Sequence, residues 1–269
     1  MPGSRLGPSR QPGAAQRSPL PFGAVNASQL PDLSQITDHL TAVSPPPPLW
    51  VVIVTGLAAL LLVGYPPVWR VLRTGVTIAH EIGHAIVAVL TGRTLRGVRL
   101  HSDTSGVTVS RGKPYGLGMI LTTMAGYPAP SALGVGCAAL VAAGRLTLML
   151  WLLVGALVVL LVFIRNLFGL LAVVCAGALV FLVSWFGSPV TQSVFGYAAT
   201  WFLLLGGARA VIELQRVHTR GDGSDADQLA GLTRVPPLLW VLLFGLVAVA
   251  ALAFGGRLLL GAWPPIGTL

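Results

Sequence analysis

The feature that most limits the possible folds is a series of apolar segments, beginning at Leu49, that are each long enough to cross a bilayer. About 20 apolar residues in a helix span the hydrocarbon core of a membrane. Only 9% of the 269 residues are charged and 54% are hydrophobic, whereas a soluble domain carries about 25% charged residues. The segments lie at 49–66, 71–91, 117–143, 146–164, 167–187, 194–214 and 236–260. We therefore predict an all-α polytopic membrane protein with six to seven transmembrane helices.

Two polar stretches interrupt these segments. The first, residues 91–115, contains two runs of alternating apolar and polar residues, 98–101 and 106–109, around a Ser-Asp-Thr-Ser turn. This alternation indicates a β-hairpin, and we expect a short hairpin at the membrane surface after the second apolar segment. The second polar stretch, residues 215–235, carries an acidic cluster. In the third apolar segment, the glycine and prolines that follow residue 125 predict a kink.

The beginning of the chain has a different composition. Residues 1–48 are rich in proline, glycine and serine, lack periodicity and end in consecutive prolines. We predict a disordered tail over residues 1–48, followed by a transmembrane domain over residues 49–269. No apolar stretch of the kind found in a cleavable signal peptide lies within the first thirty residues, so no such peptide is expected.

Basic residues indicate how the chain is oriented in the membrane. With seven spans, the tail, both polar stretches, Arg165 and Arg209 near the end of the sixth segment fall on one side, which then holds 13 of the 17 basic residues. An excess of Lys and Arg marks the cytoplasmic side, so we predict a multi-pass protein of the cell membrane with a cytoplasmic N-terminus. The net charge of +9 is explained by these scattered residues, and no nucleic-acid partner is expected.

The second apolar segment contains the sequence His-Glu-x-x-His, with His80, Glu81 and His84. Residues four apart lie on one face of a helix, so His80 and His84 are placed to bind one metal ion. Glu81 lies beside them, where it can act as the general base on a metal-bound water. The alternative is a chance match, with both histidines satisfied by backbone carbonyls. Ionisable groups inside an apolar helix are costly to bury, which favours the metal site.

A catalytic zinc ion needs a third protein ligand, and the residues leave several candidates. They are Asp103 and His101 in the hairpin, Glu213 and His218 near the sixth segment, and Asp222, Asp225 and Asp227 in the acidic cluster. The cluster also has a structural explanation, because Ser224 resembles a helix N-cap followed by acidic residues in the first turn. Cys137 and Cys175 lie in apolar runs and are expected to be packing residues.

Four features together resemble those of a known family. They are the zinc motif in an apolar segment, the hairpin after it, the Ala-Gly-Tyr sequence ending at Tyr127 and the Ser-Asp-Ala sequence around Asp225. They are similar to site-2-protease-type metallopeptidases, family M50, and most of all to the M50B-like branch common in actinobacteria. The resemblance implies that His80, His84 and Asp225 bind Zn²⁺ and that Glu81 is the catalytic base. The Asn-x-x-Pro…Asp-Gly pattern of better-known members is absent from the late segments.

The resemblance implies a zinc-dependent intramembrane endopeptidase that hydrolyses a peptide bond in a membrane-embedded protein within the lipid bilayer. Such a substrate must unwind before attack, and the hairpin is one candidate for binding the unwound segment by strand addition. A surface-lying amphipathic loop is the other interpretation of the same residues. Asn166 is a candidate donor to the substrate, or ends a helix. The alternative function is a non-catalytic membrane protein, either a metal-binding scaffold or a divalent-metal transporter.

Overall fold

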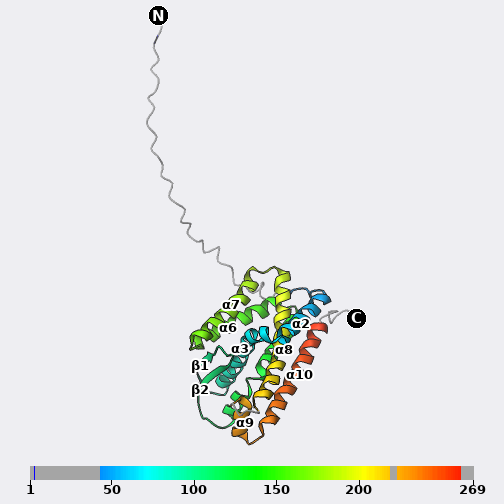
Figure 1. Cartoon of the computed structure of the whole chain (residues 1–269). Helices are drawn as coiled ribbons and strands as arrows, with labels where there is room; N and C mark the ends of the chain where they lie inside the picture. Colours follow the sequence, from blue (N-terminus) through cyan, green and yellow to red (C-terminus); the bar gives the residue numbers. More distant parts are fainter. Residues whose placement is uncertain (1–2, 4–42, 219–222, 262–269) are drawn as a thin grey trace.

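The computed structural model describes residue 3 and residues 43–218 and 223–261. Most of this chain is helical, with one two-stranded antiparallel sheet (Figure 1). The elements are α2 (Leu49–Gly64), α3 (Pro66–Leu90), β1 (Thr94–Leu100), β2 (Gly106–Arg111), α4 (Leu117–Met124), α5 (Pro128–Ala142), α6 (Leu146–Phe163), α7 (Leu167–Phe186), α8 (Pro189–His218), α9 (Asp225–Thr233) and α10 (Pro237–Gly261). The predicted all-α membrane architecture and the hairpin are confirmed. The disorder predicted for the tail falls mostly on residues 4–42, outside the described residues, and stays a prediction.

The number of spans is lower than seven. Within the described ranges, α6, α7, α8 and α10 are each long and apolar enough to cross a membrane. The other helices of sufficient apolarity form two bent pairs, α2 with α3 at 103° and α4 with α5 at 65°, so the total is at most six. Segments 49–66 and 71–91 form the first bent pair, because the two prolines that begin α3 interrupt the helix. Of the predicted six to seven spans, six is therefore the upper count among the described residues. The kink predicted after residue 125 is confirmed by the break between α4 and α5.

The centre of the molecule is built by α5, α8 and α10, which pack on one another. Leu204 of α8 is fully buried there. Side chains at Gly134 of α5 or Gly255 of α10 would come within 2.9 and 2.8 Å of Leu204. Small residues at these positions let the three helices approach closely, which is how helices associate in a membrane.

An ion-pair network fixes the bend between α2 and α3 to α8. Glu213 of α8 accepts a hydrogen bond from the Trp69 indole at 2.6 Å and pairs with Arg73 and Arg209, each at 3.3 Å. Arg209 also donates to the carbonyl of Gly64 at 3.0 Å, at the end of α2. The carboxylate of Glu213 is therefore committed to this network, and α3 is held in place at its first turns.

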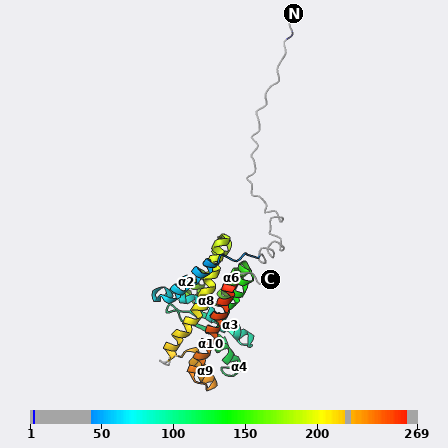
Figure 2. The ribbon, with the colours of Figure 1, turned by 90° about the vertical axis from the view of Figure 1, so that its right-hand side faces the viewer.

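The hairpin, the α6–α7 turn and α9 lie at one end of the molecule (Figures 1 and 2). The amide of Arg165 in the α6–α7 turn donates to Val98 of β1 at 2.9 Å, and α9 packs on α4. At the opposite end, the amide of Ser44 donates to Gly144, before α6, at 2.8 Å. The two polar stretches thus share a side, as predicted. Ser44, by contrast, lies at the end opposite to the hairpin, whereas a count of seven spans placed the tail on the hairpin side. The side of the membrane on which the tail lies stays a prediction.

Candidate metal centre

Helix α3 presents the His-Glu-x-x-His motif to the interior. The helix begins with two prolines, whose missing amide protons cost nothing in a first turn. It ends before Gly92, which has a φ of 74° and turns the chain towards β1. Glu81 and His84 are buried, at 2% and 8% exposure, and His80 is half-buried. The motif residues therefore lie on the inner side of α3, with Glu81 and His84 buried and His80 partly accessible.

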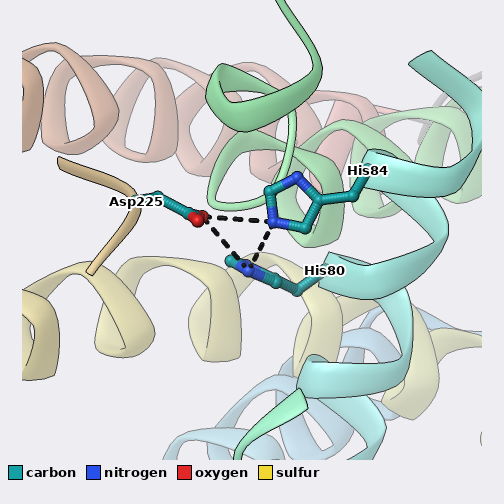
Figure 3. Close-up of side chains that lie close together, drawn as sticks. All are labelled: His80, His84 and Asp225. Atoms are coloured by element: carbon teal, nitrogen blue, oxygen red, sulfur yellow. Dashed lines mark hydrogen bonds and ion pairs between the residues drawn. The ribbon is translucent and has the colours of Figure 1, made fainter. Parts of the chain in front are cut away.

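Helix α9 supplies the third side chain. Ser224 caps this helix, and its hydroxyl accepts a hydrogen bond from the Asp227 amide while the Asp227 carboxylate accepts one from the Ser224 amide at 3.0 Å. This reciprocal arrangement is a capping box, and it uses the carboxylate of Asp227. Asp225 is the first residue of the helix, and its side chain points away from the box, towards α3 (Figure 3).

Three ligand-type atoms converge at this point (Figure 3). Oδ2 of Asp225 lies 3.3 Å from Nε2 of His80 and 3.2 Å from Nε2 of His84. The two Nε2 atoms are 3.0 Å apart. Ligand atoms held about 2.0–2.1 Å from a tetrahedral zinc ion are about 3.3 Å from one another. The triangle of side chains therefore has the dimensions of three zinc ligands with a fourth position left open.

The protonation of the site also fits a metal cation. Nδ1 of His84 lies 2.7 Å from the carbonyl of Thr122, which can only accept, so the proton of a neutral His84 is on Nδ1 and its Nε2 carries a lone pair. Oδ2 of Asp225 is buried and has no hydrogen-bond donor among the described residues. Burial raises the pKa of Asp225, but the adjacent His80 and His84 outweigh it and hold this pKa well below its usual range. A neutral His84 and an ionised Asp225 therefore present lone pairs to the same point, which is the arrangement that a metal cation binds.

The comparisons with known proteins agree with this geometry. The sequence model of the peptidase M50B-like family matches residues 53–255. The chain belongs to the peptidase M50B-like family. The resemblance noted from the motifs is thereby confirmed, and the chain is a multi-pass membrane protein of a metallopeptidase family. Searches of curated proteins and of solved structures gave no match.

The other candidate ligands of this M50B-like protein have different roles or lie outside the described residues. Asp103 accepts hydrogen bonds from the amide and hydroxyl of Ser105 at 2.9 and 2.7 Å in the exposed hairpin turn, and His101 contacts the same hydroxyl at 3.2 Å. Glu213 belongs to the network at the α2–α3 bend. Asp222 and the side chain of His218 are not among the described residues. Cys137 is buried and Cys175 exposed, and both are free thiols.

Glu81 faces the hairpin, a contact that the sequence did not reveal. Its Oε2 accepts a hydrogen bond from the Thr108 hydroxyl of β2 at 2.6 Å. A side chain at Gly106, two residues earlier, would collide with the Glu81 carboxylate. The alternating pattern predicted that positions 106 and 108 share a face of the hairpin. No local signal indicated that this face covers Glu81, because the packing of a hairpin on a helix is a tertiary contact.

The M50B-like site also depends on the break between α4 and α5. A Cβ atom at Gly126 would collide with the imidazoles of both His80 and His84. The ring of Tyr127 packs edge-on against His80, with 4.8 Å between ring centroids, and stacks on Phe244 of α10. Tyr127 therefore packs between the motif helix and α10. Gly126 and Tyr127 together limit the space in which the two histidines can move.

Replacing Gly126 by alanine is therefore expected to weaken zinc binding by about tenfold or more, the range usual for residues that orient metal ligands. The added methyl group would displace one imidazole from the ligand triangle. Competition with a zinc chelator measures the affinity. Gly136→Ala in α5 is the matched control, because a Cβ atom there meets nothing within 4 Å. Equal affinities for the two variants would contradict the assigned role of Gly126.

Proposed function

We propose that this protein is a zinc-dependent intramembrane endopeptidase that hydrolyses a peptide bond in a membrane-embedded protein substrate. The observation that carries the proposal is the convergence of His80, His84 and Asp225 on one point, with the buried Glu81 on the same helix. Membership of a metallopeptidase family and the spanning helices support it. A transporter requires a path of ionisable groups through the membrane, and within the described ranges this is the only such metal-ligand group.

His80, His84 and Asp225 would hold the ion, and Glu81 would serve as general base. A bound zinc ion polarises a carbonyl group and lowers the pKa of water towards about 7. Glu81 accepts the proton of the attacking water and passes it to the leaving amine, a transfer worth about 10²–10⁴-fold in rate. The nearly complete burial of Glu81 keeps bulk water from competing for its carboxylate and strengthens its electrostatic interactions.

The hairpin provides a binding edge for an unwound substrate. The outer edge of β1 is closed by the α6–α7 turn, because Arg165 donates to Val98 and the Asn166 side chain pairs with both backbone groups of Leu100, at 2.6 and 3.2 Å. Asn166 therefore contacts the hairpin. Thr108 of β2 contacts Glu81 through its side chain, and no strand of the described part of the chain lies beside the outer edge of β2. An extended substrate segment adding to β2 would lie next to the catalytic residue, which favours strand addition over a surface-lying loop.

The charges at the two ends support an orientation in the cell membrane. The end that carries the hairpin and the α6–α7 turn also carries most of the described basic residues outside the helices. Those residues are Arg93, Arg96, Arg99, Arg111, Lys113 and Arg165. Since Lys and Arg accumulate on the cytoplasmic side, the proposal places this end in the cytoplasm and Ser44 on the other side.

Metal removal tests the proposed function. Purified protein in lipid vesicles is expected to cleave a co-reconstituted protein with one transmembrane helix. A chelator is expected to stop cleavage, and added Zn²⁺ to restore it, because the three ligands cannot polarise the substrate without the ion. Gel analysis of the products measures both effects. Cleavage that persists in chelator would contradict the metallopeptidase mechanism, and a zinc-loaded protein that cleaves no membrane-embedded substrate would favour the non-catalytic scaffold.

A further inference from the structure

The hydrogen bond between Thr108 and Glu81 links the hairpin to the proposed base. The Thr108 hydroxyl lies 2.6 Å from Oε2 of Glu81, a short distance typical of a bond to a charged acceptor. Glu81 is 2% exposed, and no other side chain in the described part of the protein donates to its carboxylate. A buried carboxylate with a single protein donor is oriented by that donor. The hydroxyl therefore fixes the direction of the carboxylate through Oε2, while Oε1 packs against Gly106.

The main chain of Thr108 faces the open edge of β2. Thr108 pairs directly with Val98 of β1, and the Val98 carbonyl points away from β2, since it accepts from Arg165. Directly opposite residues in an antiparallel pair turn their backbone groups either towards or away from each other. The amide and carbonyl of Thr108 must therefore point away from β1. The same register applies to Gly106, whose partner Leu100 is bonded to Asn166.

We infer that Thr108 is a positioning residue that couples substrate binding to the base. Its backbone pairs with the extended substrate at the edge of β2, while its hydroxyl orients Glu81. One residue thus sets both the position of the scissile segment and the direction of the carboxylate. The inference rests on the proposed peptidase function, and it adds a residue that neither the zinc motif nor the ligand set contains.

The inference is tested by cleavage kinetics of Thr108→Val in vesicles, beside the wild type and Thr108→Ser. Valine keeps the size and β-propensity of threonine but has no hydroxyl. Its kcat is expected to fall by about tenfold to hundredfold, the range usual for residues that orient a reactive group, with KM and zinc content unchanged. Serine is expected to restore kcat. In Glu81→Gln protein, uncleaved substrate is expected to slow hydrogen exchange at the amides of residues 106 and 108.

Thr77→Val is the matched control. The Thr77 hydroxyl donates to Thr104 at 2.8 Å and ties the same hairpin to α3 without touching Glu81. Equal losses of kcat in the two valine variants would show that only hairpin anchoring matters and would overturn the inference. The inference would also be overturned if the Thr108→Val protein had a wild-type or higher kcat, or if it lost its zinc. Absence of cleavage by the zinc-loaded wild type would overturn the proposed function and this inference with it.

Discussion

Replacing Glu81 by glutamine is expected to abolish peptide-bond hydrolysis while one zinc ion stays bound. The amide keeps the size of the side chain but cannot accept a proton from water. Loss of a positioned general base lowers a rate by about 10²–10⁴-fold. The ligand atoms belong to His80, His84 and Asp225, so zinc content is expected to match the wild type. Cleavage rates in vesicles and metal analysis of the same preparations measure the two effects.

Glu213→Gln is the matched control for this variant. It removes the same charge from a half-buried glutamate in the same membrane domain, but one that pairs with Arg73 and Arg209. This variant is expected to lose stability and to keep its kcat. If Glu81→Gln protein retained wild-type cleavage, Glu81 would not be the base, and another proton acceptor would have to be sought. If the Glu81→Gln protein lost its zinc, Glu81 would be needed to bind the metal or to orient its ligands.

Metal content is expected to separate the ligands from their neighbours. The wild type should bind one zinc ion per chain, whereas His80→Ala and Asp225→Ala proteins should bind it far more weakly. Each of these variants keeps only two of the three converging ligand atoms, which is fewer than the three protein ligands that a catalytic zinc site uses. Metal analysis after purification and dialysis measures the stoichiometry, with thermal unfolding as a check that each variant is folded.

Asp227→Ala provides the control within the acidic cluster. Its carboxylate completes the capping box with Ser224, so the variant is expected to retain zinc and to lose about 1 kcal/mol of stability, a usual cost for a helix cap. If zinc were instead lost from Asp227→Ala and kept by Asp225→Ala, Asp227 would be the third zinc ligand in place of Asp225. A wild-type protein that binds no metal when Zn²⁺ is resupplied would remove the peptidase proposal altogether.

The local parts of this site could be predicted from the sequence. His80 and His84 share a helix face because of their spacing, and the break beside Gly126 follows from the glycine and prolines there. The hairpin was predicted by residues that alternate along each strand. Each of these features depends on contacts within a few residues, so the pattern of the chain determines them directly.

The tertiary parts could not be predicted in the same way. Residue chemistry did not separate Asp222, Asp225 and Asp227 as ligands, and only the family resemblance implied Asp225. In the structure, the capping box uses the carboxylate of Asp227, while the carboxylate of Asp225 lies beside His84 of α3. The contact of Thr108 with Glu81 depends on how the hairpin packs on α3. Hydropathy alone left six and seven spans open because it measures the length of apolar runs. The bend before Pro66 joins two of these runs into one bent pair, which gives at most six spans in the described part of the chain.

The position of Asp225 has a consequence for how the molecule holds together. His84 lies on α3 and Asp225 on α9, with α4 to α8 between them in the chain. A bound ion would join the two ends of this long segment, much as a disulfide closes a loop in an unfolded chain. Saturation at 100 times the dissociation constant adds about 2.7 kcal/mol to the stability of the state that binds. If the proposed zinc ion is bound, it would also act as a cross-link between α3 and α9. Removing zinc would then abolish the proposed chemistry and destabilise the fold at the same time.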